Sequence, residues 1–234
     1  MHASLDYALS GQVAILRVDD GKANALAPSL LRALQEGLRR AEKEAAAVVL
    51  SGRPGRFSAG FDLSVFQQEG PDAARAMVSA GAELAVQIAR HPTPVVIACS
   101  GHALAMGAVL LCAADLRIGA AGAFKIGFNE VAIGMAAPLF LVEFARERLS
   151  KRHLQRATVQ AKIYDPEAAV DAGFLDQVVS EGELASAALE EAQRLGRLPG
   201  AALVRTRKLL RGEMLDRIEA TLADDMAGAF PARS

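Results

Sequence analysis

The order of apolar and polar positions along the chain predicts strands and helices in alternation. Short β-rich runs predict strands, and apolar residues three and four positions apart predict helices. From Pro138 onward the pattern becomes mostly helical, which indicates an α/β core followed by helices. The expected strands are Tyr7–Leu9 and Val13–Val18 (a hairpin turning at Ser10-Gly11), Val48–Leu50, Val95–Cys99, Leu116–Ile118, Phe124–Ile126 and Gln177–Val179, and the expected early helices are Pro28–Glu44, Asp72–Arg90 and Met106–Ala113.

One uncharged stretch, Pro92–Ala114, is long enough to cross a bilayer. However, two prolines and two glycines (Pro92, Pro94, Gly101 and Gly107) interrupt it, and its front is β-branched. These features favour a buried strand that turns into a helix, and no membrane association is expected.

Composition narrows the possible functions. A chain of 234 residues, 52% apolar and 23% charged, suits one large domain, or one domain with a small appendage. The net charge of −1 and the lack of a basic run interleaved with aromatic residues argue against nucleic acid as a partner. No basic segment followed by an apolar one opens the chain, so a cytoplasmic protein is expected.

The residues that usually build metal or nucleotide sites do not occur in the required patterns. Cys99 and Cys112 lie in apolar surroundings and are expected to be buried reduced thiols. Neither H-E-x-x-H nor C-x-x-C occurs, so no metal site is expected. The G-x-G-x-x-G, P-loop and G-x-S-x-G patterns are absent as well.

Two segments rich in small residues follow predicted strands. In Arg53–Leu63, free backbone N–H groups would face a ligand, although a simple turn capped by Asp62 is the alternative. Gly101–Leu110 opens a helix near Met106, where unpaired N–H groups suit an anion or a developing oxyanion. The alternative for this second segment is close packing of helix on strand, permitted by Gly107.

A third segment, Ile126–Met135, contains an isolated carboxylate. Glu130 is the only charged residue between Lys125 and Glu143. Burial among apolar neighbours would disfavour its charged form and raise its pKa, as a general base near neutral pH requires. The alternative is an exposed glutamate at a strand edge.

The order and spacing of these three segments, together with Lys22-Ala-Asn-Ala-Leu26, resemble the crotonase (enoyl-CoA hydratase/isomerase) superfamily up to about Val179. The resemblance implies an α/β fold made of a spiral of strand–strand–helix units with a helical C-terminal region. We expect a spiral core over 1–179 and an oligomerisation region over 180–234, giving a homotrimer or a dimer of trimers. The apolar positions that motivate this expectation are Leu203, Leu209, Leu210, Met214 and Ile218.

The resemblance also implies a site that binds an acyl-CoA thioester and stabilises its enolate. The oxyanion hole would be formed by the N–H groups of Phe61 and Met106, with Gly107 as the neighbouring register, and Glu130 would be the base. Coenzyme A is part of the substrate, so no separate cofactor is expected. Lys22, Arg53 or Arg56 would offset its phosphate charge. The residues expected near coenzyme A are Lys22, Ala23, Ala25, Ser58, Ala59, Asp62 and Leu63.

Two departures from the family pattern bear on the reaction. Hydratases of the family carry a second glutamate where this chain has Val109, and valine cannot accept a proton. Many relatives have glycine where this chain has Met106, and a positive φ there would cost about 1 kcal/mol or more. We therefore expect an enoyl-CoA isomerase that moves a 3-enoyl double bond to the 2 position, with a hydratase as the close alternative. A non-catalytic acyl-CoA-binding protein is the third possibility.

Overall fold

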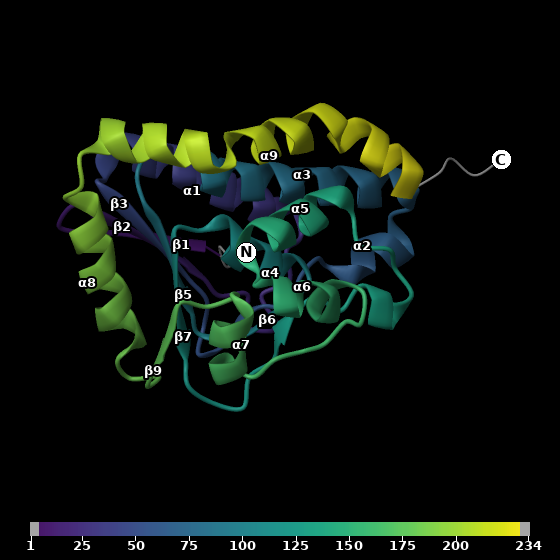
Figure 1. Ribbon diagram of the computed structural model, residues 1–234, viewed down its shortest axis with the longest axis horizontal. Coiled ribbons are helices and arrows are strands. Elements are labelled where there is room, and N and C mark those ends of the chain that lie inside the picture. Colours follow the sequence, from purple (N-terminus) through teal and green to yellow (C-terminus); the bar gives the residue numbers. More distant parts are fainter. Residues whose placement is uncertain (1–4, 230–234) are drawn as a thin grey trace.

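The computed structural model describes residues 5–229 (Figure 1). The strands are β1 (Leu5–Ser10), β2 (Val13–Val18), β3 (Ala47–Ser51), β4 (Gly55–Ser58), β5 (Val95–Cys99), β6 (Gly101–Leu104), β7 (Leu116–Ala120), β8 (Ile126–Gly127) and β9 (Gln177–Val179). The helices are α1 (Pro28–Glu44), α2 (Leu63–Gln68), α3 (Pro71–Arg90), α4 (Met106–Ala113), α5 (Leu139–Arg148), α6 (Lys151–Thr158), α7 (Pro166–Ala172), α8 (Leu184–Gly196) and α9 (Gly200–Ala229), with a 3-10 turn at Val131–Ile133.

The strands form two sheets. The larger has six strands in the order β1-β2-β3-β5-β7-β9, and the smaller has three in the order β4-β6-β8. Only the β1–β2 hairpin is antiparallel among the paired strands. Each unit β3–β4–α3, β5–β6–α4 and β7–β8–α5 places its first strand in the larger sheet and its second in the smaller. The chain is therefore the expected spiral of strand–strand–helix units.

Most predicted elements are confirmed, and two strands are missing from the prediction. β4 and β6 lie in the two segments rich in small residues, Arg53–Leu63 and Gly101–Leu110, where no strand is predicted. Each is four residues long, and they pair with each other across a long sequence separation, with Gly55 opposite Gly101. No local alternation marks them, because tertiary pairing rather than the apolar pattern makes them strands. The strand expected at Phe124–Ile126 is shifted to Ile126–Gly127, and the Phe124 ring contacts His102 instead.

The uncharged stretch Pro92–Ala114 is the interior of the protein. β5 is buried along its length and every residue of α4 is buried, which explains why this helix is apolar on all sides. Both cysteines are buried and free, as predicted, and burial raises the pKa of Cys99 to about 12 and that of Cys112 to about 11. Among the described residues no helix is long and apolar enough to span a bilayer.

The two C-terminal helices pack on the body of the molecule. α8 lies against the larger sheet, and α9 runs across α3 and α5 along the upper edge in Figure 1. Ile218 is buried and Met214 packs partly against the same core, so these two of the apolar positions singled out above contact the chain itself. Leu209 and Leu210 are 80% and 68% exposed. The division at residue 179 stays a prediction.

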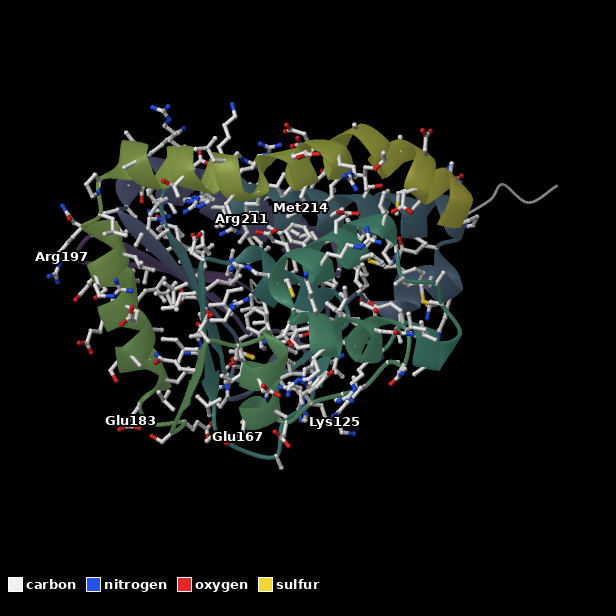
Figure 2. The ribbon with its side chains drawn as sticks, viewed as in Figure 1. Lys125, Glu167, Glu183, Arg197, Arg211 and Met214 are labelled. Carbon is white, nitrogen blue, oxygen red and sulfur yellow. The ribbon has the colours of Figure 1, made fainter. Side chains whose placement is uncertain are left out.

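A buried ion-pair cluster fastens α9 to the core. The Asp115 carboxylate, just after α4, accepts hydrogen bonds from Arg207 (2.9 Å), Arg211 (3.1 Å) and the Val95 N–H (2.8 Å). The same arginines donate to the main-chain oxygens of His91 and Ala113. Figure 2 shows Arg211 and Met214 pointing from α9 toward the body of the molecule. One carboxylate thus ties α9 to β5 and to the end of α4.

We predict that Asp115→Ala lowers the free energy of unfolding by about 3–5 kcal/mol, because two buried guanidinium groups lose their counter-charge. Chemical denaturation followed by circular dichroism measures this change. Glu213→Ala, at an exposed position of α9, is the matched control and should stay within about 0.5 kcal/mol of the parent. Equal effects of the two substitutions would contradict an anchoring role for Asp115.

Candidate active site

The loop after β4 is held in place by a buried asparagine. The Asn24 side chain donates to the main-chain oxygens of Val18 (3.1 Å), Arg56 (3.0 Å) and Phe57 (3.2 Å), and Asn24 itself has a φ of 52°. Ser58 Oγ donates to the Asn24 carbonyl (2.9 Å) and accepts from the Gly60 N–H (3.1 Å). The position of the chain just before Phe61 is therefore set by residues of the β2–α1 loop.

The same loop approaches the start of α4 very closely. A Cβ added to Gly60, whose φ is +92°, would lie 2.8 Å from the Ala105 Cβ and 3.4 Å from the Met106 nitrogen. Within the described residues, neither the Phe61 N–H nor the Met106 N–H donates a hydrogen bond to a backbone or side-chain acceptor. Two free N–H groups at the start of a helix and in an adjoining loop suit a developing negative charge.

Met106 does not have the positive φ that would be costly there, and the residue before it does. Met106 is the first residue of α4, and Ala105 before it has φ 51° and ψ −123°. A left-handed alanine costs about 1 kcal/mol or more. A Cβ on Gly107 would meet the Ser58 carbonyl oxygen at 2.7 Å, so Gly107 permits the close packing of helix on strand that was the alternative interpretation. Close packing and a free Met106 N–H therefore coexist in this segment.

These segments border a pocket of about 340 Å³. Its walls come from α2 and the loop before it, from α3, α4 and α5, from the segment after β8, and from the far end of α9. Among the described residues that line it, only Asn129 and Glu130 have polar side chains. The lining residues are Ala59, Phe61, Leu63, Phe66, Val78, Ala105, Met106, Val109, Asn129, Glu130, Ile133, Gly134, Met135, Ala136, Pro138, Phe140, Leu141 and Met226.

Glu130 is half-buried in this pocket, directly before the 3-10 turn. Burial raises the pKa of Glu130 above its ordinary value, and the N–H groups of Asn129 and Glu130 near the carboxylate offset this in part. Its Oε2 is buried without a hydrogen-bond partner. A carboxylate in this setting takes up a proton more readily than one that is exposed to water.

Val109 faces the same pocket one helical turn after Met106 and is fully buried. It presents methyl groups to the pocket, at the position where the family resemblance places the second glutamate of hydratases. The arrangement can therefore remove a proton with one base and stabilise an adjacent oxyanion, but it offers Glu130 no second acid or base on α4.

The residues expected near coenzyme A come together only in part. The Ala59 N–H donates to the Ala23 carbonyl (3.1 Å), so the two expected segments lie side by side. Ala59 and Leu63 line the pocket, and Lys22 is exposed. The Asp62 carboxylate caps α2 by accepting from the Ser64 N–H (2.9 Å), as the alternative interpretation held.

Of the basic residues considered for the phosphates, Arg53 is already engaged. Its guanidinium donates to the Lys22 carbonyl (2.7 Å) and lies 3.7 Å from the Asp19 carboxylate. Arg56 donates to the adjacent Gly55 carbonyl (2.9 Å). In the part of the chain that the structure describes, no group of three or more His, Cys, Asp or Glu side chains could hold a metal ion.

Sequence reasoning missed several residues of the pocket. Phe140 and Met226 come from α5 and α9, far along the chain, and no local pattern connects them with the three segments. Asn129 was within reach of the sequence, because it directly precedes Glu130 in a segment with few polar residues. Among the pocket residues that the sequence analysis missed, Asn129 is the one with a polar side chain.

Comparisons with known proteins all find enoyl-CoA hydratases and isomerases. The profile of the enoyl-CoA hydratase/isomerase family matches residues 9–228. A crystal structure of a protein of that family from Pseudomonas syringae is 42% identical, with a TM-score of 0.93, covering 97% of this chain and 98% of that one. A structure named as an enoyl-CoA hydratase from Mycobacterium marinum is 37% identical, with a TM-score of 0.92 over 97% and 100% of the two chains. The human mitochondrial enoyl-CoA delta isomerase 1 is 28% identical over 210 residues, 88% of this chain and 70% of that protein.

Proposed function

The chain belongs to the enoyl-CoA hydratase/isomerase family, and we propose that within it the protein is an enoyl-CoA isomerase with Glu130 as its single acid/base. The observation that carries the proposal is the composition of the pocket. The half-buried carboxylate of Glu130 faces an apolar cavity, and Val109 stands where a second carboxylate would be expected in a hydratase. The likeness to the human delta isomerase supports the same choice.

In the proposed reaction Glu130 removes a proton from C2 of a 3-enoyl-CoA. The electron pair of the C2–H bond delocalises over the former double bond and onto the thioester oxygen. The N–H groups of Phe61 and Met106 donate to that oxygen, and one such donor contributes about 3 kcal/mol to a transition state of this kind. Glu130 then returns the proton to C4, so that the double bond lies between C2 and C3 and the carboxylate is regenerated.

Coenzyme A is proposed to lie along the paired segments Lys22–Ala25 and Ser58–Leu63, with its thioester at the oxyanion donors. Lys22 is better suited to the phosphates than Arg53. The Lys22 side chain is exposed, whereas the Arg53 guanidinium donates to the Lys22 carbonyl and lies beside the Asp19 carboxylate. In this arrangement the apolar acyl chain enters the pocket between α3, α5 and α9. No separate cofactor is required by this chemistry.

Hydration of a 2-enoyl-CoA is the second candidate, since relatives such as the M. marinum protein carry the name hydratase. It would require Glu130 to activate a water without a second carboxylate. A non-catalytic acyl-CoA-binding protein is the candidate of another class. Proton exchange at C2 separates it from both enzymes, because binding alone leaves that proton in place.

We predict that Glu130→Gln abolishes deuterium exchange at C2 and isomerisation while leaving acyl-CoA binding intact. Exchange followed by NMR and binding followed by calorimetry measure the two effects.

Because the raised pKa means that ionisation of Glu130 opposes folding, the variant should also be more stable than the parent at neutral pH. This difference should fade as the pH falls through the pKa of Glu130 in the folded protein. Undiminished exchange would exclude Glu130 as the base.

We predict that the parent protein moves the double bond of a 3-enoyl-CoA faster than it hydrates any 2-enoyl-CoA. Losing one positioned acid or base commonly costs about 10²–10⁴ in rate, which is the deficit expected for hydration. Val109→Glu should raise the ratio of hydration to isomerisation, and Val109→Gln is its uncharged control. Parallel assays of both reactions measure the ratio. Faster hydration by the parent protein would contradict the assignment as an isomerase.

We further propose a homotrimer or a dimer of trimers, with the exposed leucines in the first half of α9, Leu209 and Leu210, in the interface. Light scattering at micromolar concentration should give three or six times the mass of the chain. Leu209→Asp with Leu210→Asp should reduce that mass, because each charge would be buried against an apolar surface. A monomeric mass for the parent protein would refute this proposal.

A further inference from the structure

The polar side chain of Asn129 lies in the pocket but has no part in the proton transfers of the proposed reaction. Asn129 lines the same cavity as Glu130, and the rest of that lining is apolar. Asn129 Oδ1 and Glu130 Oε2 are both buried without a hydrogen-bond partner. A buried acceptor left unsatisfied costs about 1–3 kcal/mol. Two such acceptors on adjacent residues of one pocket therefore indicate a role for both.

The backbone around these two residues is fixed on both sides. Before them, β8 pairs with β6 and Phe128 is buried. After them, the Ile133 N–H donates to the Asn129 carbonyl (3.2 Å) and the Met135 N–H to the Glu130 carbonyl (2.9 Å). The Glu130 carboxylate lies close enough to the N–H groups of Asn129 and of Glu130 itself for them to lower its pKa. It consequently lies beside residue 129, from which the asparagine side chain also enters the pocket.

Among the described residues that line the pocket, Glu130 is the only charged one. The described residues of α3, α4, α5 and α9 that line the pocket are all uncharged. Asp225 on α9 is not among the lining residues, and its carboxylate accepts from the Leu139 N–H (2.8 Å) at the start of α5. Among the lining residues, the Asn129 carboxamide is therefore the one polar side chain, besides Glu130 itself, that can form a hydrogen bond with Glu130 when Glu130 gains or loses a proton.

We propose that Asn129 is a positioning residue for Glu130, whose carboxyl group donates to Asn129 Oδ1 while it carries the proton taken from C2. This inference rests on the proposed isomerase function. The C2–H bond breaks as the O–H bond of Glu130 forms, and the O–H bond breaks as the C4–H bond forms. Asn129 gains and loses no proton in either step.

The proposal explains why both oxygens lack partners in the resting site. With Glu130 ionised, Oε2 and Oδ1 are two acceptors and cannot bond to each other. With Glu130 protonated, its carboxyl O–H would donate to Asn129 Oδ1, and both oxygens would then have a partner. The hydrogen bond thus favours the protonated form that exists between the two proton transfers, and it keeps that proton within the pocket until it reaches C4.

The test is the pH dependence of kcat/KM for isomerisation of trans-3-hexenoyl-CoA. Asn129→Leu keeps the approximate shape and removes the acceptor. It should lower kcat about tenfold and move the acidic limb down by about half a pH unit to one unit, because the protonated form of Glu130 loses a hydrogen bond. Asn129→Asp places a second carboxylate in the pocket and should move the same limb upward.

Gln155→Leu, at an exposed position of α6, makes the same amide-to-leucine change away from the pocket and should leave both rate and limb unchanged. Thermal melts of all variants control for folding. An acidic limb that stays in place or moves upward in Asn129→Leu overturns the proposal, since a packing role would leave it in place and a donor role would raise it. A parent protein without isomerisation, or Glu130→Gln with undiminished exchange, would instead overturn the proposed function itself.

Discussion

The candidate site depends on the close approach of two chain segments that are far apart in sequence. Gly60 and Ala105 come so near that an added Cβ at residue 60 would lie 2.8 Å from the Ala105 Cβ. This contact brings Phe61 and Met106 together in the wall of one pocket. A glycine at φ +92° on one side and a strained alanine on the other make the approach possible. The pairing of β4 with β6, directly before these residues, keeps the two segments close together.

Two polar networks stabilise this arrangement from opposite sides. Asn24 and Ser58 fix the loop that ends at Phe61. Asp115, with its two buried arginines, fixes the end of α4 and the α9 helix. At the other end of α9, Asp225 accepts a hydrogen bond from the Leu139 N–H at the start of α5, and the next residue, Met226, forms part of the pocket wall. Backbone donors and side-chain walls are thus positioned by groups that do not themselves face the pocket.

The chemistry of the site follows from how few polar groups it contains. In an apolar cavity a single carboxylate is destabilised in its charged form, and burial is the largest cause of the raised pKa of Glu130. The other lining residues include the apolar Val109 and the neutral amide of Asn129, neither of which can act as a second base. A proton can be removed and returned in such a place, whereas an attacking water finds only one base.

The local pattern of the sequence was sufficient for the long elements. Helices such as Pro28–Glu44 and strands such as Val95–Cys99 have the predicted bounds, because their apolar spacing is regular over many residues. The isolation of Glu130 between Lys125 and Glu143 also anticipated its raised pKa. Tertiary structure alone decided that Gly55–Ser58 and Gly101–Leu104 are strands, that Ala105 rather than Met106 has the strained backbone, and that Met226 reaches the pocket. Each of these depends on contacts between distant segments, and such contacts leave no periodic signal in the residues that make them.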